Sequence, residues 1–232
     1  MFMYGFDPTF VLLIPAMIFA MWAQWKVQST YAQMSRVRAA NGMTGSDMAK
    51  AIMRRNGVTD VQVEEVGGVL SDHYDPRSKT VSLSAGIARG DSIASIAVAA
   101  HEVGHVLQHA TGYPGLAMRS AIAPVASIGS MAAFPLFFIG FFFNIPGMSK
   151  TLMDIGILLF SGAVVFHMIT LPVEFDASKR ALVQLTDSGS IAPEEVAGAK
   201  KVLDAAALTY VAAAAMAALQ LLRLVMIRDS RR

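Results

Sequence analysis

Long apolar stretches dominate the pattern of hydrophobic and polar positions along the chain. Residues 9–25, 120–143 and 155–173 hold no Asp, Glu, Lys or Arg, and each is close to the roughly twenty residues that a helix needs to cross a bilayer. A fourth stretch, residues 205–222, is rich in alanine, so it is either a transmembrane helix or a buried helix at the membrane surface; we favour a span. The pattern predicts three to four transmembrane helices, the first a retained anchor rather than a cleaved signal peptide.

The second and third apolar stretches are separated only by the short link at residues 144–150. Two spanning helices joined by so short a link form an antiparallel hairpin, whose outer ends return to the same side of the membrane. We therefore expect the residues just before position 120 and just after position 173 to lie close together.

Residues 26–119, between the first two apolar stretches, show the shorter patterns of a small α+β part. One helix is predicted from Ser46–Asp47 to Asn56–Gly57, and another from a capping residue in Asp91–Ser92 to about Gly112. The predicted strands are residues 61–66, 68–74 and 80–84, the last two joined by a turn at 75–78.

The composition agrees with a membrane protein and limits the chemistry. Of the 232 residues, 54% are hydrophobic and 16% are charged, whereas a soluble domain carries about a quarter charged residues. The net charge of +2 is too small to indicate nucleic-acid binding. The chain has no cysteine, so any metal must be bound by nitrogen and oxygen atoms.

The basic residues predict the orientation in the membrane. Lys26, Arg36 and Arg38 follow the first span, which places the region between the first two spans on the cytoplasmic side. The arginines at residues 228–232 contradict this rule if the fourth segment crosses the membrane.

The second predicted helix carries the sequence His101-Glu102-Val103-Gly104-His105. Residues four apart share one face of a helix, so His101 and His105 can bind the same metal ion. Glu102 is then close enough to a metal-bound water to act as a general base without being a ligand. This is the pattern of a zinc peptidase, and a pair of ordinary helical histidines is the alternative. Gly104 leaves room on the far side of the turn for a neighbouring segment to approach the metal closely.

A catalytic zinc ion usually has three protein ligands, so one more is needed. Glu174 is the best-placed candidate, because the hairpin returns it to the side of His101 and His105; an interfacial carboxylate is the alternative. His109 points past the metal on a continuing helix, and His167 lies inside a span, so both are weaker candidates.

Several other residues are assigned roles around the predicted site. His73 and Tyr74 are candidates for the hydrogen-bond donor that stabilises the oxyanion, and we favour them over Tyr113; the alternative is that they only shape a turn. Asp176 faces another side of its helix than Glu174 and could orient a ligand. Substrate backbone could add to a sheet edge at residues 81–83, or that strand is interior.

These residues carry a family resemblance. Residues 101–109 (HEVGHVLQH), 171–178 (LPVEFDAS) and 71–77 (SDHYDPR) resemble the membrane neutral zinc metallopeptidases of the YugP type, over most of the chain from about residue 40. That family is in turn similar to the HtpX-like heat-shock proteases and the CAAX prenyl endopeptidases. In those proteins a Glu after a transmembrane hairpin is the third ligand and an acidic residue lies four positions later. The resemblance implies Glu174 as ligand, while the later position here is Ser178.

Together these observations predict a mainly α-helical integral membrane protein with a small α+β, zincin-like part, in which the HExxH helix and a transmembrane hairpin build the site. The chain is predicted to begin with an N-terminal transmembrane anchor at 1–25, followed by an extramembrane α+β part with the HExxH helix at 26–119. A transmembrane hairpin at 120–173 comes next, and then an extramembrane helical part with the third zinc ligand at 174–203. Residues 204–232 are predicted to form a fourth transmembrane helix with a basic tail.

The predicted function is that of an integral membrane zinc metalloendopeptidase of the gluzincin type. Zinc would be held by His101, His105 and Glu174, and Glu102 would act as general base. The expected partners are the lipid bilayer and a protein or peptide substrate associated with the membrane, and no nucleic acid. We expect a multi-pass protein of the cell membrane with its active site on the cytoplasmic side. The alternative is a catalytically silent membrane adaptor with a structural zinc site.

Overall fold

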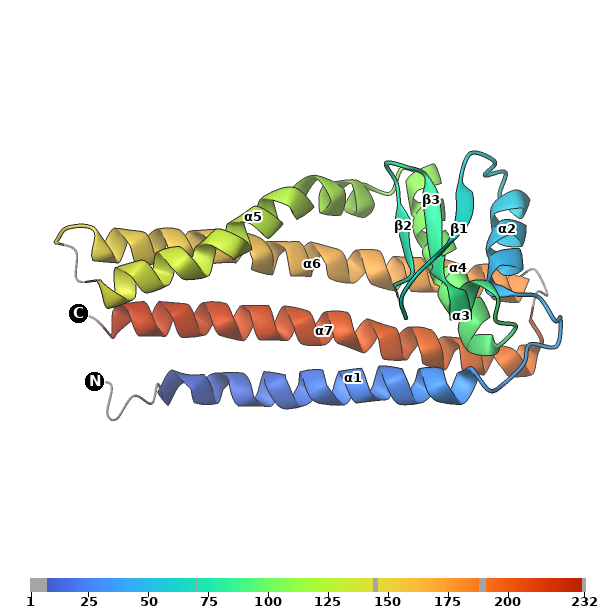
Figure 1. The fold of residues 1–232 in the computed structure, drawn as a ribbon, viewed down its shortest axis with the longest axis horizontal. Coiled ribbons are helices and arrows are strands. Elements are labelled where there is room, and N and C mark those ends of the chain that lie inside the picture. The colour runs from blue at the N-terminus through green and yellow to red at the C-terminus, as the bar shows by residue number, and fades with distance from the viewer. Residues whose placement is uncertain (1–7, 70, 144–145, 188–190, 231–232) are drawn as a thin grey trace. The chain divides into compact units, whose positions relative to one another are not determined.

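The computed structural model describes residues 8–69, 71–143, 146–187 and 191–230 (Figure 1). The elements in chain order are η1 (Pro8–Leu13), α1 (Ile14–Met34), α2 (Gly45–Arg55), β1 (Gln62–Val66), β2 (His73–Asp75), β3 (Thr80–Ser84), α3 (Ala85–Ala88), α4 (Ile93–Ala110), α5 (Pro114–Phe142), α6 (Ser149–Asp187) and α7 (Pro193–Asp229). The chain divides into two compact units, which we describe separately. The membrane unit comprises Met1–Trp22, Met118–Leu171 and Thr209–Arg232, and the α+β unit comprises Ala23–Ala117 and Pro172–Leu208.

The described residues contain four helical segments long and apolar enough to cross a membrane. These are Pro8–Met34, Pro114–Phe142, Ser149–Asp187 and Pro193–Asp229. The predicted mainly helical membrane protein with a small α+β part is thereby confirmed, and residues 205–222 lie within α7. Asn144 and Ile145 of the predicted link lie outside the described residues, as do residues 1–7 and 231–232 of the two predicted terminal segments.

Close helix packing organises the membrane unit. Phe137 of α5, Phe160 of α6 and Leu224 of α7 belong to one buried cluster. A side chain at Gly156 would place its Cβ only 2.7 Å from the carbonyl oxygen of Ala133, so the absence of a side chain lets the α5 and α6 backbones approach. Pro124 and Pro135 interrupt the hydrogen bonding of α5, and the helix bends in Figure 1.

Polar contacts show how the helix ends of the membrane unit are paired. Arg228 near the end of α7 donates to Asp154 near the start of α6 over 2.7 Å. Arg223 donates to Thr9 in η1 over 3.3 Å. The last part of α7 therefore lies beside the first parts of η1 and α6, so α7 runs antiparallel to both.

The core of the α+β unit is α4, a helix whose apolar and small side chains are buried along most of its length. It packs against α2 and against strands β2 and β3. Strand β3 lies between β1, with which it is parallel, and β2, with which it is antiparallel. Fully buried Met48 and Ile52 from α2, and Leu83 from β3, belong to the cluster around α4.

Two predicted element boundaries are wrong for local reasons. The strand expected at residues 68–74 begins only at His73, although Leu70 itself lies outside the described residues. Asp72 accepts hydrogen bonds from the backbone N–H and the hydroxyl of Ser84, so this side chain replaces strand pairing just before β2. Helix α2 is capped by Thr44 and not by Ser46, because Thr44 and Asp47 form a reciprocal capping box.

Of the two alternatives for residues 81–83, a sheet edge open to substrate and an interior strand, the structure has the interior strand. All three residues pair with β1 on one side, Val81 and Ser82 also pair with β2 on the other, and both Val81 and Leu83 are buried. A strand with neighbours on both sides presents no free row of backbone hydrogen-bonding groups. The outer strands of this sheet are β1 and β2.

A second close approach joins α4 to the part of α6 that lies in the α+β unit. A Cβ atom on Gly104 would overlap the backbone carbonyl of Ala177. Because Gly104 lies between the two histidines of the motif, this contact brings the histidine face of α4 against α6. The neighbouring segment at Gly104 is α6, the helix that carries Glu174.

We predict that Gly104→Ala separates α4 from α6. Although alanine favours a helix over glycine, overpacking of this kind costs about 1–3 kcal/mol. The melting temperature in detergent should fall. Gly86→Ala is the control, because its Cβ would meet only the Tyr31 hydroxyl at 3.7 Å, an ordinary contact. Equal melting temperatures for the two variants would contradict the prediction.

We also predict that Gly156→Leu disrupts the packing of α5 on α6, because its Cβ would collide with backbone and with Phe137. Thermal melting in detergent should show a clear loss of stability. Gly162→Leu lies on the same helix, and a Cβ there meets nothing within 4 Å, so it should melt close to the wild type. A stable Gly156→Leu protein would argue against this helix contact.

Candidate metal centre

Helix α4 presents His101 and His105 side by side. Ser92 caps the N-terminus of α4, and its hydroxyl accepts a hydrogen bond from the backbone N–H of Ser95. The helix ends at Ala110, and Gly112, which follows, has a left-handed backbone conformation. The two imidazole centroids lie 4.9 Å apart and the rings are nearly perpendicular. The predicted helix and the shared face of its histidines are both present.

Helix α6 brings Glu174 to the same point. Its Oε2 atom lies 3.2 Å from Nε2 of His101 and 3.5 Å from Nε2 of His105. Each of the three buried residues offers one ligand atom, and these atoms lie within 4.8 Å of one another. Among the described residues, they form a group that could hold a metal ion, and two imidazoles with one carboxylate is a donor set that suits zinc.

The outer nitrogens of both imidazoles have their own partners. Nδ1 of His101 lies 3.1 Å from the hydroxyl of Ser178, and Nδ1 of His105 lies 2.9 Å from the side-chain oxygen of Gln108. With Nδ1 engaged, the Nε2 atom of each ring is the one directed at Glu174. Ser178 thus occupies the position four residues after Glu174 and contacts a predicted ligand, as an acidic residue would.

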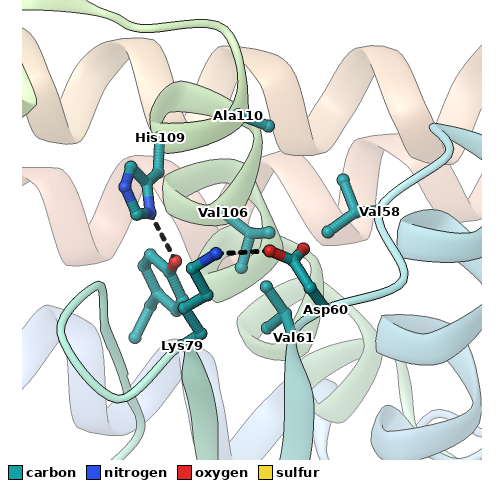
Figure 2. Close-up of a pocket in the computed structure, with 8 residues that line it drawn as sticks. Val58, Asp60, Val61, Lys79, Val106, His109 and Ala110 are labelled. Atoms are coloured by element: carbon teal, nitrogen blue, oxygen red, sulfur yellow. Dashed lines mark hydrogen bonds and ion pairs between the residues drawn. The ribbon is translucent and has the colours of Figure 1, made fainter.

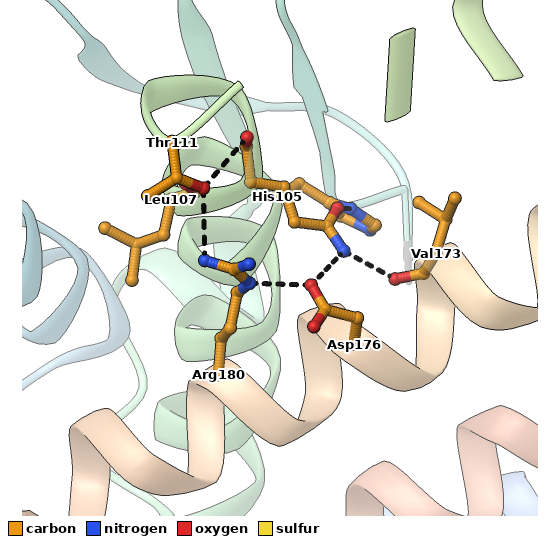
Figure 3. Close-up of polar contacts among 7 residues, drawn as sticks. His105, Leu107, Thr111, Val173, Asp176 and Arg180 are labelled. Atoms are coloured by element: carbon orange, nitrogen blue, oxygen red, sulfur yellow. Dashed lines mark hydrogen bonds and ion pairs between the residues drawn. The ribbon is translucent and has the colours of Figure 1, made fainter. Parts of the chain in front are cut away.

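Sequence reasoning missed the roles of Ser178 and Gln108. The available signal was spacing, since Gln108 lies three residues after His105 and Ser178 four after Glu174, which are neighbouring positions on a helix surface. Asp176, considered as a residue that could orient a ligand, contacts Gln108 rather than a histidine (Figure 3). Its carboxylate also accepts from Arg180 over 2.6 Å.

The electrostatics of the cluster favour a cation. Burial disfavours the charged form of His105 and so lowers its pKa. The hydrogen bond and the charge of Glu174, together with the charge of Glu102, outweigh the effect of burial. The pKa of His105 is therefore raised. Glu102 is itself buried, with 8% of its surface exposed. Glu174 contacts both imidazoles, so the cluster favours a positive charge at this point, carried by an imidazole or by a bound cation.

Tyr74 and His109 meet in a neighbouring pocket of about 210 Å³, shown in Figure 2. The Tyr74 hydroxyl lies 2.7 Å from Nδ1 of His109. The pocket also contains the ion pair of Lys79 with Asp60 and a floor of valine and alanine side chains. Burial, with the nearby charges of Asp60 and Asp75, raises the pKa of Tyr74 to about 12, so its phenol stays protonated at neutral pH.

His73 has different surroundings. Its ring is exposed, and Nδ1 donates to the backbone oxygen of Ser71 over 2.9 Å. Consecutive strand residues face opposite sides of a sheet, so His73 and Tyr74 point in opposite directions. The oxyanion roles assigned to both residues stay predictions.

The other histidines considered as ligands do not belong to the cluster. His109 is paired with Tyr74, and His167 lies in the membrane unit with its ring 5.8 Å from that of Phe166. Tyr113 is the less favoured oxyanion donor. The guanidinium carbon of Arg180 lies over the Tyr113 ring, 5.8 Å from the centroid of that ring.

Comparison with known proteins points to the same chemistry. The chain matches the family described as "Putative neutral zinc metallopeptidase" over residues 9–229. It is 48% identical over 219 residues to the protein named "Putative membrane protease YugP" of Bacillus subtilis (strain 168), a match that covers 93% of this chain and 94% of the relative. No solved structure matches the chain. The family match spans both units and includes every residue of the cluster, and the chain therefore belongs to the neutral zinc metallopeptidase family.

Proposed function

We propose that the protein is an integral membrane zinc endopeptidase that cleaves membrane or membrane-proximal proteins. The observation that carries the proposal is the buried convergence of His101, His105 and Glu174 from two helices. Glu102 follows His101 directly on α4 and acts on His105 through its charge, which suits a base beside the metal rather than a ligand.

In this mechanism the three ligands hold zinc, which when bound supplies a Lewis acid and a water of lowered pKa. Glu102 accepts a proton from the attacking water and then passes it to the nitrogen of the leaving amine. The Nδ1 partners, Ser178 and Gln108, keep both rings oriented with Nε2 toward the metal.

Tyr74 and His73 are the two candidates for the donor to the developing oxyanion, and because they face opposite sides of the sheet, they are proposed as alternatives. Tyr74 is placed first, because its phenol keeps its proton and it contacts α4 at His109, one turn beyond His105. If His109 donates through Nδ1, the Tyr74 proton is free to point at substrate. The pocket floor of Val58, Val61, Val106 and Ala110 would accept an apolar part of that substrate.

The same proposal places the active site on the cytoplasmic side of the cell membrane. Lys26, Arg36 and Arg38 after the first span support this orientation. The proposed partners are the lipid bilayer and a membrane-associated protein or peptide. A silent adaptor with a structural zinc site is less favoured, because such a site fills four positions with protein ligands, whereas the described cluster offers three.

We predict that Glu102→Gln abolishes catalysis while zinc stays bound. Loss of a general base costs on the order of 10²–10⁴ in rate. The test is cleavage of casein or a membrane protein by the purified protein in detergent, with zinc content measured in parallel. Glu65→Gln, in an exposed pair with Arg89, is the control and should keep its activity. Wild-type cleavage by Glu102→Gln would refute the mechanism.

We predict that Glu174→Ala loses zinc, because one of three ligand atoms is removed. Metal content after dialysis should drop from about one zinc per chain to near zero, a stoichiometry that follows from a single three-ligand catalytic site. His167→Ala in the membrane unit should retain the metal. Normal zinc content in Glu174→Ala would mean that another residue is the third ligand.

We predict that Tyr74→Phe lowers kcat with little change in KM. Removing a single oxyanion donor costs about 10²–10³ in kcat. His73→Ala tests the other proposed donor in the same assay, and Tyr31→Phe, packed against the core, is the control. Unchanged kcat in both Tyr74→Phe and His73→Ala would remove these two residues from the mechanism.

A further inference from the structure

Gln108 of α4 is a fully buried amide that contacts α6. Its side-chain NH₂ donates to the backbone oxygen of Val173 over 2.7 Å and to the carboxylate of Asp176 over 2.9 Å. Both partners are acceptors, since a carbonyl has no proton and the Asp176 carboxylate is paired with Arg180. The two N–H bonds are therefore both used, and the orientation of the amide is determined.

This orientation determines the tautomer of His105. The only remaining polar atom of the Gln108 side chain is its oxygen, which lies 2.9 Å from Nδ1 of His105. An amide oxygen can only accept, so Nδ1 must carry a proton and donate it. In a neutral imidazole Nε2 then has the free electron pair, and Nε2 is the atom directed at Glu174.

The same amide also fixes the backbone next to the third candidate ligand. Val173 is the residue immediately before Glu174, and its carbonyl oxygen is one of the two acceptors of Gln108. One side chain thus contacts His105 on α4 and the backbone beside Glu174 on α6. Ser178 has a simpler environment, because among the described residues its hydroxyl is hydrogen-bonded to His101, and a hydroxyl can rotate to donate or accept.

We propose that Gln108 is the positioning residue of the metal centre, setting the His105 tautomer and the separation of His105 from Glu174 together. The inference rests on the proposed function, since it assigns Gln108 a role toward zinc. Orienting residues of this kind are worth about 10–100-fold in metal affinity.

The far side of the network keeps Gln108 in place. Arg180 donates to Asp176 over 2.6 Å and to the hydroxyl of Thr111 over 3.2 Å. The backbone oxygen of Gln108 accepts from Tyr113 N–H over 2.8 Å at the end of α4. Asp176 accordingly acts on His105 through Gln108. An Asn at position 176 has both a donor and an acceptor, so it would let the Gln108 amide rotate and present NH₂ to His105.

The test compares zinc binding by the full-length protein in detergent for the wild type, Gln108→Met and Asp176→Asn. Gln184→Met is the matched control. Gln184 is a glutamine on α6 whose side-chain oxygen accepts hydrogen bonds from Asn56 and Arg55 and not from the residues of the metal cluster. Zinc dissociation constants come from competition with a chromophoric chelator. The visible spectrum of the cobalt-substituted protein reports ligand geometry, and thermal melting of the metal-free protein reports stability.

We expect Gln108→Met to bind zinc about 10–100-fold more weakly than the wild type and to have an altered cobalt spectrum. Asp176→Asn should show a smaller loss of zinc affinity. Gln184→Met should match the wild type in both affinity and spectrum. Wild-type affinity and spectrum in both cluster variants would overturn the inference. A lower melting temperature with unchanged affinity would also overturn it, since the role would then be structural. If Gln108→Met does not fold, Asp176→Asn alone decides. A wild type that binds no zinc would instead refute the proposed function.

Discussion

The contact of α4 with α6 at Gly104 and Ala177 is the constraint on which the candidate site depends. The absence of a side chain at Gly104 allows backbone to meet backbone. At that separation short polar side chains on one helix reach those on the other, so Glu174 meets both imidazoles and Ser178 reaches His101. With bulkier packing the same side chains would be separated by apolar atoms, and the cluster would not form.

Burial of so many polar groups is possible because nearly every one has a partner. A buried polar group that loses its hydrogen bond costs about 1–3 kcal/mol, so the partners of the cluster decide whether it is tolerated. Gln108 shows how this works, since all of its side-chain hydrogen-bonding atoms are used although none of its surface is exposed. Glu174 lies between the two imidazoles at the centre of these contacts, and its negative charge is one that a bound cation would balance.

Much of the fold and of the candidate site could be predicted from the sequence, because both produce periodic signals. The four apolar stretches and the i, i+4 histidines depend only on helix geometry, and the hairpin placed Glu174 near them. The contacts of Gln108 and Ser178 depend on which residues face each other across two helices, and no local pattern encodes that. Whether β3 is an edge or an interior strand stayed open for a related reason, because strand order is set by the parallel pairing of β1 with β3.

The stretch of α6 after Pro172 makes specific contacts on successive turns: Glu174 with the histidines, Ala177 with Gly104, Arg180 with Thr111 and Gln184 with Asn56. Each helical residue turns the following ones by about 100° and moves them by about 1.5 Å. A single inserted or deleted residue there would rotate all later contacts away from their partners at once. The length of this stretch is therefore constrained as a whole, in addition to the individual residues that make the contacts, and its spacing is as characteristic of the candidate site as the spacing of the two histidines.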